Sequence, residues 1–136
     1  MKCVAPVVLA GTVVLLVYSF LTLSAQTPKP QPLTLPLQCE AGYCVLLRGT
    51  PQTAGMRSGL VRLKTGESIG EHTTGKNEES LVVLRGQGEA RIEGHPAIAF
   101  TAPALVYIPS ASKHNVANTG AELLEYVYVV APAQAP

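Results

Sequence analysis

Short apolar segments recur about every 8 to 12 residues after Leu37, and turn-forming residues separate them. Glycine and proline supply most of these turns, with 12 glycines and 11 prolines in 136 residues. No segment in this region keeps a 3.6-residue apolar period, so we expect no helix there. The pattern predicts an all-β sandwich or barrel. The expected strands cover residues 45–48, 58–64, 79–85, 89–92, 97–100, 105–108, 114–118 and 123–130.

The N-terminal 25 residues have a composition of their own. Residues 3–23 follow Lys2 without a charge, which predicts an export signal. The apolar run is also long enough to span a bilayer, so cleavage and retention as a transmembrane anchor both stay open. Either outcome places the rest of the chain outside the cytoplasm, in the periplasm or extracellular space or tethered to a membrane.

Residues 26–37 carry four prolines, which favour an extended, semi-rigid linker. We therefore expect a leader (1–25), this linker, one folded domain (38–131) and a disordered tail (132–136). Cys39 and Cys44 follow the linker, and two close cysteines usually pair in an oxidising compartment. A local disulfide is the favoured interpretation, because a zinc site would lack its other ligands.

Composition excludes some partners. The formal net charge is +1 and tryptophan is absent, so we expect no nucleic acid partner. The chain has no fingerprint for an organic cofactor. A membrane would be contacted only through an uncleaved N-terminal segment.

One segment combines a histidine with a carboxylate. Five residues separate Gly66 from His72, and one separates His72 from Thr74. Four residues then separate Thr74 from Glu79, and six separate Glu79 from Gly86. We interpret Gly86-Gln87-Gly88 as a tight turn, after which the chain returns as a second strand. Both glycines are expected to need unusual backbone angles.

A second segment follows the first at a fixed distance. It contains Pro109, His114 and Asn118, and Asn118 is expected to hold a loop through backbone hydrogen bonds. Together the two segments resemble the two motifs of the cupin family, and in particular the small single-domain cupins. Thr74 stands where the first motif has its second histidine. Ala111 and Pro103 stand where the second motif has glycines.

The resemblance implies a double-stranded β-helix, or jelly-roll, barrel. It also implies that His72, Glu79 and His114 bind a divalent metal inside the barrel. Thr74 is not counted, because a neutral hydroxyl is a weak ligand. Two imidazoles and one carboxylate suit Fe(II), and also Mn or Zn.

The strand at 79–85 is apolar on both faces. Alternation places Glu79 inside if the motif's register holds, and then Glu78 faces solvent or a loop. Val82 and Leu84 make the opposite face apolar as well, and such a strand is usually covered on both sides. Another segment or a second subunit would provide the cover, so a homodimer is expected.

Other polar side chains allow two interpretations each. Tyr107, Tyr126 and Tyr128 either offer hydroxyls to a ligand or serve as core or interface aromatics. Arg85 and Arg91 either hold an anion at the barrel mouth or form a solvated rim.

Three functions remain open at this level. The first is an exported metal-binding cupin with an oxygenase, isomerase or decarboxylase type of reaction. The second is a non-catalytic cupin that holds a small ligand, and the third is a structural module without metal. Whether the protein is an enzyme depends on the metal, because no nucleophile–base pair is evident elsewhere.

Overall fold

The computed structural model describes residues 29–133, and this part of the chain contains strands and no helix. No helix in the described residues is long and apolar enough to cross a membrane. The predicted leader and most of the predicted tail lie outside the described residues. The strands are β1 (Tyr43–Arg48), β2 (Arg57–Leu63), β3 (His72–Thr73), β4 (Asn77–Arg85), β5 (Gln87–Ile92), β6 (Ile98–Thr101), β7 (Ala104–Ile108), β8 (Lys113–Asn118) and β9 (Leu124–Pro132).

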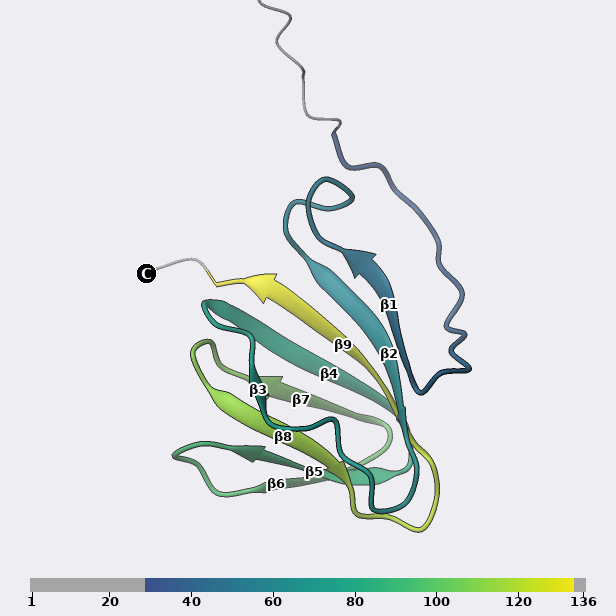
Figure 1. Cartoon of the computed structure of the whole chain (residues 1–136), viewed down its shortest axis with the longest axis vertical. Helices are drawn as coiled ribbons and strands as arrows, with labels where there is room; N and C mark the ends of the chain where they lie inside the picture. The colour runs from purple at the N-terminus through teal and green to yellow at the C-terminus, as the bar shows by residue number, and fades with distance from the viewer. Residues whose placement is uncertain (1–28, 134–136) are drawn as a thin grey trace, which may run out of the picture.

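The strands form two antiparallel sheets that face each other (Figure 1). The larger sheet has the order β1-β2-β9-β4-β7, and the smaller has the order β3-β8-β5-β6. Successive strands often change sheet, which is the jelly-roll way of closing a β-structure around one core. The predicted all-β, double-stranded β-helix fold is therefore confirmed.

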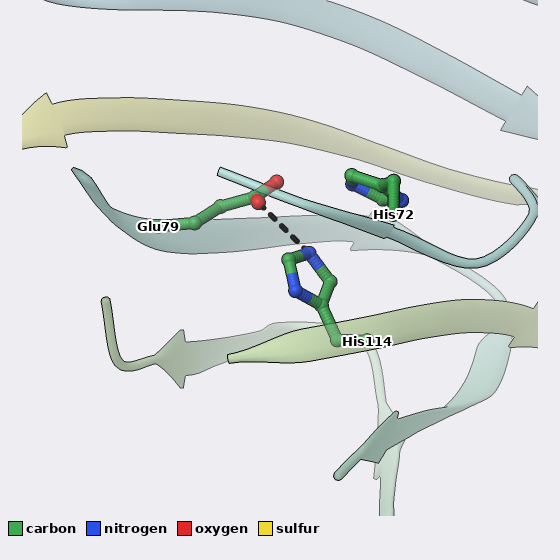
Figure 2. Close-up of side chains that lie close together, drawn as sticks. All are labelled: His72, Glu79 and His114. Atoms are coloured by element: carbon green, nitrogen blue, oxygen red, sulfur yellow. Dashed lines mark hydrogen bonds and ion pairs between the residues drawn. The ribbon is translucent and has the colours of Figure 1, made fainter. Parts of the chain in front are cut away.

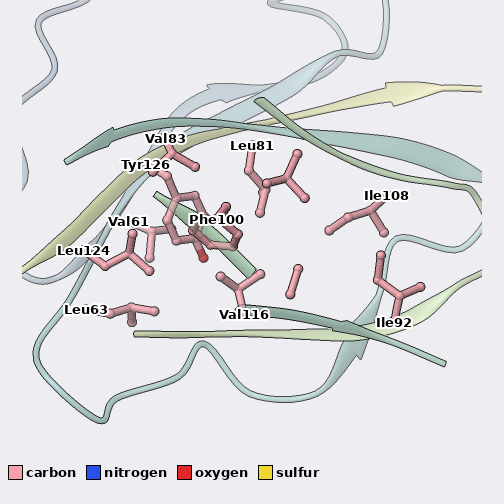
Figure 3. Packing of buried hydrophobic residues seen from close by; sticks show 12 residues of the cluster. Val61, Leu63, Leu81, Val83, Ile92, Phe100, Ile108, Val116, Leu124 and Tyr126 are labelled. Atoms are coloured by element: carbon pink, nitrogen blue, oxygen red, sulfur yellow. The ribbon is translucent and has the colours of Figure 1, made fainter. Parts of the chain in front are cut away.

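The core lies between the inner faces of the two sheets (Figure 3). Burying each of its large side chains contributes about 1.5–3 kcal/mol. Its buried residues are Val61, Leu63, Leu81, Val83, Ala90, Ile92, Phe100, Val106, Ile108, Val116, Leu124 and Tyr126.

Side chains that share a row across β2, β9 and β4 point to the same face, because paired residues in a sheet do so. One inner row consists of Val61, Tyr126 and Val83, and all three are at most 2% exposed. Two rows further along, register pairs Arg57 and Glu79 with the same residue of β9, Val130. The inner face thus changes from apolar to polar along its length.

The outer face of β4 and β7 is apolar and uncovered by the described part of the chain. Val82 and Leu105 are cross-strand partners on this face and are 40% and 70% exposed. Leu84 is 42% exposed on the same face. The expected cover is thus not supplied by residues 29–133, and the homodimer stays a prediction.

The predicted tight turn at Gly86 is wrong. β4 and β5 belong to different sheets and do not pair, so the chain crosses between sheets at this point. Gly86 has a φ of 80°, as expected for a residue in the left-handed region. Gly88 lies in β5 without a positive φ, and a Cβ there would come within 2.6 Å of the Ala117 carbonyl oxygen. Close packing, not backbone angle, explains this second glycine.

The predicted disulfide between Cys39 and Cys44 is confirmed, and it holds the start of the domain against β1. Arg62 of β2 donates a hydrogen bond of 2.6 Å to the carbonyl oxygen of Cys39 and forms an ion pair with Glu125. The segment before the disulfide runs beside β1 (Figure 1). These contacts fix the point where the linker joins the domain.

Candidate metal centre

His72, Glu79 and His114 meet between the two sheets at the polar end of the inner face (Figure 2). One nitrogen of each histidine and one oxygen of Glu79 all lie within 4.8 Å of one another. His72 on β3 and His114 on β8 are cross-strand partners, and their ring centroids are 4.3 Å apart. Glu79 approaches from β4 in the opposite sheet. The structure therefore brings together the three residues that the motif spacing singled out.

Each histidine uses one ring nitrogen for orientation. The Nδ1 atom of His72 lies 2.9 Å from the carbonyl oxygen of Gly70. The Nδ1 atom of His114 lies 3.0 Å from the carbonyl oxygen of Ser112. A carbonyl only accepts, so each Nδ1 carries the proton and each neutral ring keeps its lone pair on Nε2. Metal-binding histidines are commonly oriented in this way.

The buried contact between His114 and Glu79 brings together two hydrogen-bond acceptors when His114 is neutral with its proton on Nδ1 and Glu79 is a carboxylate. Nε2 of His114 lies 3.1 Å from Oε2 of Glu79, and the two residues are 1% and 5% exposed. An additional proton or a cation is required between these atoms. Burial opposes a charge on the ring, but hydrogen bonds to Glu79 and the Ser112 carbonyl outweigh it and raise the pKa of His114. A divalent cation would satisfy both groups, so the donor set fits a metal.

Thr74 lines a cavity beside His72 and Glu79, but its hydroxyl already forms a hydrogen bond within the turn between β3 and β4. Oγ1 of Thr74 donates to the carbonyl oxygen of Asn77 over 2.8 Å. Nδ2 of Asn77 donates in return to the Thr74 carbonyl, also over 2.8 Å. The threonine thus shapes the loop that follows His72, and it offers a metal only a neutral oxygen.

A cavity of about 180 Å³ is lined by two of the three residues, His72 and Glu79. It has room for about six water molecules at ~30 Å³ each, which suits a small ligand. Three tyrosines contribute to its wall. Its lining residues are Tyr43, Arg57, Val61, Ile69, His72, Thr73, Thr74, Glu79, Val116, Tyr126, Tyr128 and Val130.

The three candidate tyrosines lie on different faces of the larger sheet. Tyr126 and Tyr128 line the cavity, as an inward-facing pair on β9. Burial and then the charge of Glu79 raise the pKa of Tyr126, so its hydroxyl stays protonated at neutral pH. Tyr107 lies on the outer face, 54% exposed, and donates to Glu78 over 3.0 Å. Glu78 therefore faces outward, as alternation predicted.

The two candidate arginines do not reach the cavity. Arg85 is paired with Glu122 and Arg91 with Glu89, and both arginine side chains are more than half exposed. The arginine that lines the cavity is Arg57, which sequence reasoning missed. Only its register with Glu79 across β9 reveals it, and register is not visible in the sequence.

Asn118 has the structural role predicted for it. Its Nδ2 donates to the carbonyl oxygens of Leu63 and Glu122 over 2.8 and 2.7 Å. Its Oδ1 accepts from the backbone nitrogen of Gly120 over 2.8 Å. The residue is 2% exposed and joins β8 to the loops beside it, away from the cavity.

Comparison with solved structures shows which proteins share this fold. A protein from Bacillus halodurans is 24% identical, with 79% of this chain and 86% of that chain covered and a TM-score of 0.65. An RmlC-like cupin family protein with a double-stranded β-helix fold from Methanocaldococcus jannaschii is 19% identical, with 74% and 91% covered and a TM-score of 0.60. The cupin domain of Cnp3 from Schizosaccharomyces pombe is 18% identical, with 74% and 70% covered and a TM-score of 0.61.

At these identities the structural likeness establishes the fold alone. No curated protein matches the chain significantly. The family model described as "Cupin domain" matches residues 59–130, which is more than half of the chain and includes both motifs. The chain therefore belongs to the cupin family.

Proposed function

We propose that this protein is an exported cupin that holds a divalent metal with His72, Glu79 and His114 and presents it to a small molecule. The contact between Nε2 of His114 and the Glu79 carboxylate carries the proposal. Both histidines already commit Nδ1 to a carbonyl, so their remaining nitrogens and the carboxylate need an added proton or a cation between them. A metal ion resolves this arrangement.

Each residue of the site would have a distinct role. Glu79 would neutralise part of the metal's charge, and the two imidazoles would bind through Nε2. When bound, the metal would supply Lewis-acid polarisation of a ligand oxygen or, as Fe(II), reactivity toward O₂. Tyr126 would offer a protonated hydroxyl from the wall of the cavity.

Export is part of the same proposal. The disulfide between Cys39 and Cys44 supports it, because such bonds persist in oxidising compartments and are rare in the cytosol. The uncharged apolar residues 3–23 support it independently.

Metal content of the full chain tests the proposal. The protein is purified without a histidine tag, loaded in turn with Fe(II), Mn(II) and Zn(II), and measured by elemental analysis. We expect near-stoichiometric metal in the wild type and its loss in His114→Ala. His95→Ala is the matched control, because His95 is exposed in a turn away from the cavity. Absence of metal from the wild type would leave a non-catalytic ligand-binding cupin as the better function.

A second variant tests the geometry rather than the fold. Thr74→His restores the histidine that the family motif has at this position. It should raise metal affinity by about tenfold or more, since even partners outside the ligand set change metal affinity by about 10- to 100-fold. Competition with a metal-binding dye measures this. Unchanged affinity in a folded variant would count against the proposed ligand set.

A further inference from the structure

Arg57 shares both a face and a cavity with the proposed metal ligands. Register places Arg57, Val130 and Glu79 in one row across β2, β9 and β4. Two strand spacings separate Arg57 from Glu79, which is about 10 Å between backbones. Arg57 and His72 both line the cavity between them. A small molecule in the cavity therefore has Arg57 at one side and two of the proposed ligands, His72 and Glu79, at the other.

The charge of Arg57 has no counterpart in the described residues. Arg62, Arg85 and Arg91 each form an ion pair with a glutamate, whereas none involves Arg57 within residues 29–133. Its cross-strand partner on β1 is another arginine, Arg48. Like charges directly opposite each other destabilise a sheet. An anion bound beside Arg57 would relieve this repulsion.

A pair of tyrosines lines the cavity beside Arg57. The hydroxyls of Tyr43 and Tyr128 are 2.8 Å apart, and their rings stack with centroids 5.7 Å apart. Gly59 makes this possible, because a Cβ there would lie 2.5 Å from the Tyr128 ring. One hydroxyl donates to the other, which leaves one hydroxyl proton for a ligand oxygen.

We propose that Arg57 binds the carboxylate of a small organic acid whose other oxygen-bearing end faces His72, Glu79 and His114. The inference rests on the proposed metal site. A divalent ion with one carboxylate and two neutral imidazoles keeps one positive charge, and Arg57 adds a second. A dicarboxylate balances both. The cavity volume suits an acid of about two to five carbon atoms.

Isothermal titration of the Mn(II)-loaded full chain with oxalate, malonate and succinate tests this proposal. Arg57→Gln should weaken the tightest-binding acid by about tenfold or more, because a charge-assisted bidentate contact is lost. Arg48→Gln is the matched control, since it removes a neighbouring charge outside the cavity lining, and it should change the affinity by less than about threefold. Malonamide, the neutral analogue of malonate, should not bind.

Three results would overturn the inference. They are no binding of any acid by the wild type, equal losses in Arg57→Gln and Arg48→Gln, and malonamide binding as tightly as malonate. Elemental analysis of the same samples shows whether a loss of acid binding comes from the Arg57 site or from a failure to retain metal. If no metal is retained, the acids are titrated into the metal-free protein. Binding that depends on Arg57 but not on Arg48 then supports the anion site by itself.

Discussion

The inner face of the larger sheet has two ends that differ in chemistry although the same three strands build both. At one end, Leu63, Leu124 and Val83 belong to the core and are at most 6% exposed. At the other end, Arg57 and Glu79 flank Val130 beside a cavity. The alternation of the strands is the same at both ends, so the residue types alone separate core from site. The packed end supplies stability, which allows the open end to be polar and incompletely filled.

The largest expected effect comes from breaking the packed end. Leu124 on β9 is 0% exposed, and Leu124→Ala should lower the free energy of unfolding by about 2–5 kcal/mol. Val130→Ala at the open end widens an existing cavity and should cost only about 1–2 kcal/mol. Urea unfolding of the metal-free proteins measures both. Equal costs would contradict the division between the two ends.

A smaller effect of opposite sign is expected in the loop that leads to His114. Ala111 has a φ of 59°, in the left-handed region that favours glycine. Ala111→Gly should therefore raise the free energy of unfolding by about 1 kcal/mol. Ala117→Gly in the extended strand β8 is the control and should lower it by about 0.5–1 kcal/mol. A destabilised Ala111→Gly variant would show that the loop gains more from the alanine side chain than it loses in backbone energy.

The smallest effect is a pH dependence confined to the open end. The pKa of His114 is raised in the folded, metal-free protein, so protonation there stabilises the fold. This stability is fully present below the unfolded pKa of about 6.5 and is lost as pH rises through the folded pKa. The metal-free wild type should therefore lose free energy of unfolding as the pH rises above about 6.5 and through the raised pKa of His114.

Two controls bracket that pH dependence. Glu79→Gln removes the charged partner and should flatten it. Metal loading should reverse it, because protons compete with metal for His72 and His114. A wild type whose stability rises over the same interval without metal would contradict the assignment.

The sequence predicted the fold class and the site ligands for different reasons. Turn residues at regular spacing indicated many short strands, and the motif positions of His72, Glu79 and His114 brought three distant residues to one place. It did not predict β3, because two residues carry no periodicity. It also misread Gly86, because alternation along one strand says nothing about which sheet the next strand joins.

Arg57, the cavity residue that the sequence did not reveal, also shows that strand pairing cannot be read from the sequence. Arg57 begins a strand next to a turn, and such a residue is typical of a solvated surface. Only the pairing of β2 with β9 and of β9 with β4 places it opposite Glu79. Tyr107 and Tyr128 are both tyrosines within strands, yet one faces out and one faces in. Residue type identified the candidates, and long-range register decided among them.

The stacked Tyr43–Tyr128 pair gives this protein an optical signal of its own. The chain has no tryptophan, so no indole emission masks the tyrosines, and four of the five tyrosines lie in the described part. Two of these four share a hydrogen bond beside the cavity. A molecule that enters the cavity and accepts a hydrogen bond from one of these hydroxyls changes the environment of that pair directly. Intrinsic ultraviolet fluorescence would thus register occupancy of the barrel without a label.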